Sequence, residues 1–340
     1  NTNTSISWLY DGTAPTLSSV SIASNNSTST QAVADDVVTL TFTASEAIAT
    51  PVVTFQSGGA AITDTSVTYV NTSGNTWTAA YTANASDTSG AVTFSIAFTD
   101  TAGNAGTAVT SGSGSVTYDA TAPTMTITAA EVSDGDTSND GTLSLTFTAS
   151  EATTDFVVGD ITVSGGALSS FSATSSTVYT ATFTPSGAGA TTIDVASSKF
   201  TDAAGNGNTA ATQFNWTYDG TAPTMAITAS EVSDGGTSND GTLSLTFTSS
   251  EATSNFVVGD ITVSGGALSN FKASSSTIYK ATFTPSGAGA TTIDVDSSKF
   301  TDASGNNNEA APQFNWTYDP TKPTLSITAD GVKDGDTSND

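Results

Sequence analysis

The sequence predicts an all-β chain built as a tandem array of two-sheet sandwiches. Three observations predict it. Apolar and polar residues alternate in short runs, as in "LSLTFTAS" at 143–150. Clusters of Gly, Asn, Asp and Ser separate these runs, as turns do. The phrase "YDGTAPT" at 10–16 returns in near-identical form about every hundred residues, which is typical of a repeated unit of domain size.

The alternation predicts individual strands. In 143–150 every second residue is apolar, so one face of this strand is expected to be buried. The stretches "VYTATFT" (178–184) and "QFNWTY" (213–218) follow the same pattern, and the second places Trp216 in the core. The corresponding Trp8 and Trp316 are expected to be core residues too, and so is Trp77. Shorter strands are expected at 125–128, 160–165 and 191–195. About seven strands in a hundred residues indicate a sandwich of two sheets.

The repeats define the predicted domains. Residues 120–219 and 220–319 align without a gap and differ at about 17 of 100 positions, and 17–117 is a more distant copy. We therefore expect three complete units, called repeats 1, 2 and 3, within a window cut from a longer array. The predicted boundaries are 1–16 (C-terminal tail of a preceding repeat), 17–118 (repeat 1), 119–218 (repeat 2), 219–318 (repeat 3) and 319–340 (start of a following repeat).

Four phrases give the chain a family resemblance. "TFTASEA", "DITVSGGALSSF", "FTDAAGN" and the "YDxTAPT" joint recur along essentially all 340 residues. With them the chain resembles the bacterial immunoglobulin-like domains that are strung in tandem in large surface adhesins and biofilm proteins. The resemblance implies an immunoglobulin-like β-sandwich for each repeat and an extracellular, cell-surface location. Such modules serve as spacers, as sugar-binding tips and as virion appendages, so the phrases identify the domain class better than the role.

The acid of the joint phrase suggests a metal site. In immunoglobulin strand order, the loop with "SEA" and the loop with "TDxxGN" lie at the end of the repeat where the joint acid arrives. Ca²⁺ takes six to eight oxygen ligands, commonly from carboxylates, amides and backbone carbonyls. We expect one Ca²⁺ at each joint, whereas the alternative is that these acids only form turns. The candidate ligands are Asp11, Glu46, Asp100 and Asn104; Asp119, Glu151, Asp202 and Asn206; and Asp219, Glu251, Asp302 and Asn306.

A second acidic stretch is a weaker candidate. "SDGDTSNDG" (133–141) matches the start of an EF-hand loop, but its twelfth position is Phe147 rather than Glu. Repeat 3 also has Gly236 at the position of one acid. A plain acidic hairpin turn is the favoured interpretation. The residues that would otherwise contribute to a metal site are Asp134, Asp136 and Asp140.

Composition excludes several functions. The chain has 32 Asp and Glu against six basic residues, all lysine, for a formal charge of −26. Such a chain repels nucleic acid and anionic membranes and attracts divalent cations. It contains no histidine and no cysteine, which removes the Ser–His couple, thiol chemistry and Cys-rich zinc sites. The Gly-rich stretches at 164–167 and 186–191 lack a P-loop lysine and are expected to be turns. We therefore expect no enzyme.

The predicted function is mechanical. The sequence favours an extracellular spacer or stalk of a large adhesin, stiffened by Ca²⁺ where repeats join. Its partners would be neighbouring repeats of the same chain, with no nucleic acid and no membrane contact. One alternative is a filament or virion subunit, in which "SISWLY" (5–10) or "LSITA" (325–329) is exchanged between copies. Another is a module that binds a glycan or a protein.

Overall fold

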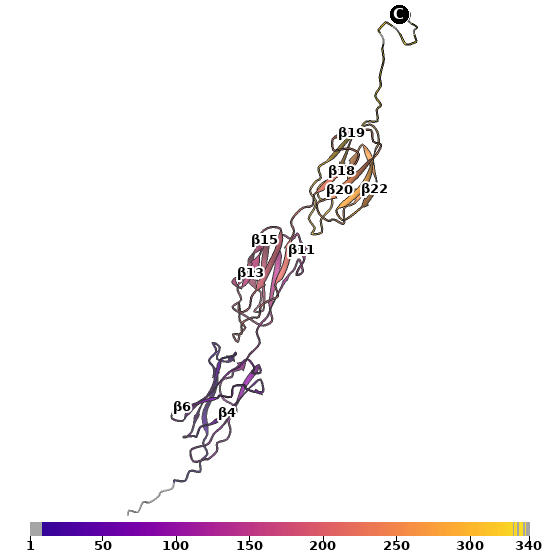
Figure 1. Cartoon of the computed structure of the whole chain (residues 1–340). Coiled ribbons are helices and arrows are strands. Elements are labelled where there is room, and N and C mark those ends of the chain that lie inside the picture. Colours follow the sequence, from indigo (N-terminus) through magenta and orange to yellow (C-terminus); the bar gives the residue numbers. More distant parts are fainter. Residues whose placement is uncertain (1–8, 329, 332, 336, 338–340) are drawn as a thin grey trace, which may run out of the picture. The chain divides into compact units, whose positions relative to one another are not determined.

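The fold consists of β-strands and their connections (Figure 1). The computed structural model describes residues 9–328, 330–331, 333–335 and 337. In this part of the chain the only helical segments are two short 3-10 turns, η1 (Val158–Asp160) and η2 (Val258–Asp260). None of the described helices is long and apolar enough to cross a membrane. Trp8 lies outside the described residues, as does the first half (1–8) of the tail predicted at 1–16.

Repeat 3 contains two four-stranded sheets (Figure 1). The first has the order β18 (Met225–Ala229), β20 (Leu243–Ser249), β23 (Ile278–Pro285), β22 (Gly266–Ala273). The second has the order β19 (Gly236–Ser238), β25 (Phe314–Tyr318), β24 (Gly289–Asp294), β21 (Thr262–Ser264). Neighbouring strands pair antiparallel, except that β19 pairs in parallel with β25.

The core of repeat 3 comes from the alternation seen in the sequence. In β20, Leu243, Leu245 and Phe247 are at most 1% exposed, whereas the residues between them face outward. Phe247 pairs with Tyr279 of β23 across the same sheet. The second sheet adds Trp316, 1% exposed, to the same buried cluster. The apolar faces of the two sheets thus enclose one core, which removes this surface from water.

An aromatic residue in a loop joins this core. Phe256 follows β20 by seven residues and is 3% exposed. Its ring lies edge-on to Tyr279 at 5.0 Å and to Phe300 at 5.2 Å between centroids. Such contacts add to the free energy of burial. Phe256 therefore fixes the loop that begins with the "SEA" phrase, and with it the position of Glu251.

Repeat 2 has the same strand order. Its first sheet is β10 (Met125–Ala129), β12 (Leu143–Ala149), β15 (Val178–Pro185), β14 (Gly166–Ala173). Its second sheet is β11 (Thr137–Ser138), β17 (Phe214–Tyr218), β16 (Gly189–Val195), β13 (Ile161–Ser164). Phe147 and Trp216 are at most 1% exposed, as the sequence predicts for Trp216, and Trp316 of repeat 3 is equally buried.

Repeat 1 is a variant of this plan. One sheet has four strands, β1 (Leu17–Ser24), β3 (Val37–Ala44), β7 (Thr76–Thr82) and β6 (Thr68–Ser73). The other has five, β2 (Gln31–Ala32), β9 (Thr117–Tyr118), β8 (Gly90–Ala97), β4 (Val52–Ser57) and β5 (Ala60–Ala61). Leu40 and Phe42 are fully buried, whereas Trp77 is only partly buried and packs against the edge of this core.

Three local predictions differ from the structure. The expected turn at 164–167 is short: Gly165 has a φ of +74°, which glycine adopts without steric cost, and the unpredicted strand β14 begins at the next residue. Likewise β16 begins at Gly189, within the turn expected at 186–191. The acidic stretch 133–141 is more than a hairpin turn, because Thr137 and Ser138 pair in parallel with β17.

The segment after repeat 3 begins no new strand within its described residues. Residues 319–328 belong to no strand, and Leu325 and Ile327 are 86% and 87% exposed. The last residue of the candidate exchange strand, 329, lies outside the described part, as do residues 5–8 of the other candidate.

Candidate metal centres at the joints

The joint acid forms a local turn. In each of the four joint phrases a carboxylate Oδ1 accepts a hydrogen bond from the backbone N–H two residues later, at 2.9–3.1 Å. The backbone of the same residue is fixed from the other side. The N–H of Asp119 donates to the carbonyl of Ala32, and that of Asp219 to the carbonyl of Ser138, both at 2.9 Å. This Asx turn explains why an acid recurs in the phrase even at Asp319, where the structure shows no further carboxylates of a cluster among the described residues.

The loop before the last strand contributes a buried carboxylate. Asp202 is 8% exposed, and its Oδ1 accepts backbone N–H bonds from Ala204, Gly205 and Asn206 at 2.7–2.9 Å. Asp100 and Asp302 occupy the same place in repeats 1 and 3 and are 3% and 7% exposed. Buried carboxylates need such donors because desolvation otherwise disfavours their charge. The "TDxxGN" loop is therefore built around its own aspartate.

The asparagine of this loop connects it to the joint. The Nδ2 of Asn206 donates to Oδ2 of Asp202 at 2.9 Å and to the backbone carbonyl of Asp119 at 3.2 Å. Asn306 makes the same two bonds in repeat 3, both at 2.9 Å, and Asn104 makes them in repeat 1. The amide nitrogen, not the oxygen, thus faces the carboxylates. These asparagines hold the joint against the loop.

The "SEA" glutamate completes each cluster. In every case one carboxylate oxygen of each of three acids lies within 4.8 Å of the others. The clusters bring together Asp11, Glu46 and Asp100; Asp119, Glu151 and Asp202; and Asp219, Glu251 and Asp302. Nine of the twelve sequence-predicted ligands, all of the acids, are thereby brought together in threes, as the strand order requires.

The glutamates of the clusters in repeats 2 and 3 have raised pKa values. Partial burial raises the pKa of Glu151, and the carboxylates of Asp119 and Asp202 raise it further. The pKa of Glu251 is raised by burial and by Asp219 and Asp302. By contrast, the hydrogen bond from the Asn104 side chain lowers the pKa of Asp100, with help from the backbone N–H groups of its loop. In repeats 2 and 3, partial burial and the two neighbouring carboxylates thus both disfavour the charged form of the glutamate.

The clusters of repeats 2 and 3 differ at one side chain of the "TDxxGN" loop. In repeat 3 the hydroxyl of Ser304 donates to Oδ2 of Asp219 at 2.8 Å. Repeat 2 has Ala204 at this position. The sequence prediction did not include Ser304, although the Ala204/Ser304 difference between the two repeats points to it. A hollow of about 360 Å³ adjoins the cluster of repeat 2 and is lined by Asp119, Glu151 and Asp202.

The second acidic stretch is not part of these clusters. Oδ1 of Asp134 accepts bonds from the backbone and side chain of Asn215, at 2.6 and 3.3 Å. Oδ2 of Asp140 accepts a bond from Ser138 at 2.7 Å. Among the described residues, neither these two acids nor Asp136 belongs to a group of three potential metal ligands. The structure thus gives Asp134 and Asp140 roles in the hydrogen bonding of their own loop.

A family model matches the two near-identical repeats. The model is described as a bacterial Ig-like domain, and it matches residues 119–218 and 219–318. The two matches cover more than half of the chain and include the second and third carboxylate clusters. No curated protein matches the sequence.

Solved structures of tandem domains are also similar. The fragment I67–I69 of the titin I-band is 9% identical over 90% of this chain and 98% of that chain, with a TM-score of 0.34. InvD from Yersinia pseudotuberculosis is 15% identical over 89% of this chain and 98% of that one, with a TM-score of 0.37. Invasin, described as a bacterial integrin-binding protein, is 13% identical over 89% of this chain and 60% of that one, with a TM-score of 0.35. At this level of similarity, none of the three supports an argument about the function of this chain.

Proposed function

Because the chain belongs to the bacterial Ig-like domain family, we propose that it is an extracellular spacer whose joints bind Ca²⁺. In this proposal the repeats form part of the stalk of a large cell-surface adhesin. The family consists of structural and binding modules, so the role is mechanical rather than catalytic. The partners of each repeat are its neighbours in the same chain. The net charge of −26 supports the absence of nucleic-acid and anionic-membrane partners.

The observation that carries the proposal is the double attachment of the joint aspartate. The backbone of Asp219 is bonded to Ser138 in repeat 2, while its side chain lies with Glu251 and Asp302 in repeat 3. No residue intervenes between these two attachments. A cation bound to the three carboxylates would therefore link the end of one repeat directly to the loops of the next.

The donor set fits Ca²⁺. Each cluster offers three carboxylates in which the aspartates already have backbone donors, and His and Cys ligands are absent from the chain. Hard oxygen ligands of this kind suit Ca²⁺ and not the softer transition metals. Asp119, Glu151 and Asp202 would hold the ion of repeat 2, and Asn206 would position Asp119 and Asp202. When bound, the ion would supply the positive charge that the cluster lacks.

Binding would stabilise the joint. An ion that binds only the folded arrangement adds stability by mass action. It would also offset the burial and the carboxylate repulsion that together raise the pKa of Glu151 and Glu251. Without the ion, we expect the repeats to move more freely about the joints and the joint backbone to be cut more readily by proteases.

Calorimetric titration of the whole chain with Ca²⁺ tests the proposal. We expect three ions per chain in the wild type and two in Glu151→Gln, because this variant removes a carboxylate from one cluster only. Glu309→Gln is the matched control, since its side chain is exposed and lies outside the clusters. It should still bind three ions. Absence of Ca²⁺ binding in the wild type, or an equal loss in both variants, would contradict the proposal.

The mechanical part has its own measurement. Small-angle scattering of the same chain should show a narrower range of maximum dimensions in millimolar Ca²⁺ than in EDTA. A chain that binds three ions but shows the same distribution in both buffers would have calcium sites without a stiffening role.

A further inference from the structure

The two lysines on the outer face of repeat 3 form an unusual pair. Lys272 on β22 and Lys280 on β23 are direct partners in the antiparallel register. Like charges placed opposite each other destabilise a sheet. Within the described part of the chain, neither ammonium group has an ion-pair or hydrogen-bond partner that would offset this cost. Two of the six basic residues of the chain thus lie side by side, and the positive charge of neither is neutralised by an ion pair.

Comparison with repeat 2 shows that the pair is an addition. Repeat 2 has Ser172 and Thr180 at the corresponding positions. Among the roughly 17 differences between the two repeats, these are the only two that add a positive charge, and they fall on one cross-strand pair. The sheet itself does not require them, because repeat 2 builds the same four-stranded order without them.

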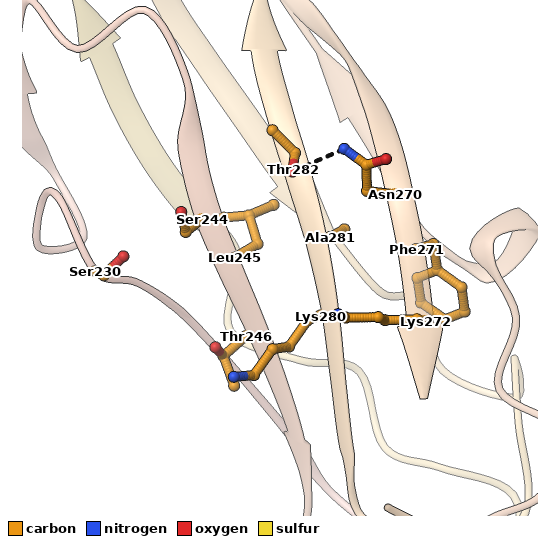
Figure 2. A pocket seen from close by; sticks show the side chains of 10 residues that line it. All are labelled: Ser230, Ser244, Leu245, Thr246, Asn270, Phe271, Lys272, Lys280, Ala281 and Thr282. Carbon is orange, nitrogen blue, oxygen red and sulfur yellow. Dashed lines mark hydrogen bonds between the residues drawn. The ribbon is translucent and has the colours of Figure 1, made fainter. Parts of the chain in front are cut away.

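The pair lines an open hollow of about 730 Å³ on this sheet (Figure 2). Figure 2 shows Lys280 extended toward Thr246 of β20, with Lys272 directed across β23. The rest of the polar lining consists of hydroxyls and one amide. Its members are Ser230, Ser244, Thr246, Thr282 and Asn270. The volume lies within the usual range for a small-ligand site.

A bulge in β22 shapes the hollow. The register with β23 shifts between Ser269 and Lys272, and Asn270 has a φ of +53°. The Nδ2 of Asn270 donates to Oγ1 of Thr282 at 3.4 Å. Bulges redirect side chains and often occur beside binding sites. Here Asn270 is directed toward Thr282 of β23, where both residues line the hollow (Figure 2).

We infer that this hollow binds an acidic oligosaccharide, with a uronic-acid carboxylate held between Lys272 and Lys280. The sugar hydroxyls would exchange hydrogen bonds with the hydroxyl and amide lining. The lining decides among anionic ligands, because its hydroxyls and amide can bind sugar hydroxyls while the two lysines bind a carboxylate. Densely sulfated polymers carry more charge per sugar and would be repelled more strongly by the acidic surface, and so would a second copy of this chain.

The test is binding of tetragalacturonate to the full chain at low salt, measured by calorimetry in EDTA. The chelator removes Ca²⁺, so that ion bridges to the joint clusters cannot contribute. We expect one site per chain. K272S/K280T restores the residues of repeat 2, so the sheet should fold, and the affinity should fall at least tenfold. The control K199S/K299S removes two exposed lysines elsewhere and should change the affinity less than twofold.

A gain-of-function variant completes the test. S172K/T180K introduces the pair into repeat 2 and should raise the stoichiometry from one to two. Binding that K272S/K280T leaves intact, equal binding of a neutral dextran oligosaccharide, or no binding at all would overturn the inference. Binding of a heparin oligosaccharide but not of tetragalacturonate would overturn the assignment of a carboxylate ligand.

Discussion

Repeats 2 and 3 have nearly the same sequence and the same strand order, yet they differ in surface and joint. Of the roughly 17 positions at which they differ, only 149/249 and 204/304 are buried in either repeat. The core aromatics Phe147 and Phe247 are both fully buried. The differences lie instead on an outer sheet face, in the "SEA" loop and at the joint. The comparison shows that the interior specifies the fold, while the surface is where one repeat acquires properties that the other lacks.

The largest expected effect should be equal in the two repeats. Phe147→Ala and Phe247→Ala each remove a fully buried ring, which typically costs about 3–5 kcal/mol in free energy of unfolding. Hydrogen exchange of each repeat's own peptides in the full chain measures the two losses separately. A difference of more than about 1 kcal/mol between the variants would show that the two cores are not equivalent.

Much of this architecture follows from the sequence because the strand pattern is local. The alternation in 143–150 and the turn residues beside it specify β12 without reference to the rest of the chain. β14 was missed because its strand "GALSSFSA" has small residues and lacks regular alternation at Ser170, which has a φ of +54°. Phe256 was missed for another reason: a single aromatic residue in a loop has no periodicity, so its place in the core depends on tertiary packing.

In the candidate metal site, too, some features could be predicted from the sequence and others depend on tertiary packing. Strand order alone brings Asp119, Glu151 and Asp202 to one end of the repeat, and for this reason their grouping could be predicted. The orientation of the Asn206 amide could not, because it depends on which lone pairs the Asp202 loop leaves open. The pairing of Thr137 with β17 could not be predicted from residue spacing either, because parallel pairing joins residues that are far apart in the chain.

The second prediction concerns pH and should also be equal in both repeats. The pKa values of Glu151 and Glu251 are raised, and Ca²⁺ requires both carboxylates in their anionic form. Lowering the pH through these raised pKa values, which lie above the ordinary glutamate value of 4.5, should therefore weaken Ca²⁺ binding, by up to about tenfold per pH unit for each proton displaced. Without the metal the sign reverses: raised pKa values stabilise the fold at low pH and cost stability as the pH rises through them. Titrations from pH 4 to pH 7, with and without Ca²⁺, check both signs.

The third prediction is that repeats 2 and 3 differ in how their stability depends on pH below about 4. Asp155 accepts bonds from Thr153 Oγ1 at 2.6 Å and from the backbone N–H and Oγ1 of Thr201. Burial acts to raise the pKa of Asp155, but these hydrogen bonds outweigh it and the net shift is downward. Asn255 makes the equivalent contacts in repeat 3 without a charge.

A lowered carboxylate pKa contributes stability above its ordinary value of about 3.8, and this contribution is lost as the pH falls below that value. Repeat 2 should therefore lose stability between pH 4 and pH 2 through Asp155, and repeat 3 should not at the matching position. Asp155→Asn should remove the dependence. At pH 7 it should cost at most about 1 kcal/mol, because charge-assisted bonds become neutral ones at an exposed site. Acid titration by hydrogen exchange of repeat 2, with the Asn255→Asp variant as the converse, checks the prediction.

The smallest expected effect lies at Ser304. Its hydroxyl bond to Asp219 Oδ2 has no counterpart in repeat 2, where Ala204 stands. Ser304→Ala should lower the stability of the third joint by about 0.5–1 kcal/mol in metal-free buffer, a low value for a hydrogen bond, because Ser304 is partly exposed to water. It should leave the count of bound Ca²⁺ unchanged, because all three carboxylates of the cluster remain.

The reciprocal Ala204→Ser is the matched control. Ala204 is buried and Ser304 is not, so a hydroxyl added at 204 also has to be desolvated. The stability gained by Ala204→Ser should therefore be smaller than the stability lost in Ser304→Ala. Equal and opposite effects of the two variants would show that the joints have the same geometry and differ only in this hydroxyl.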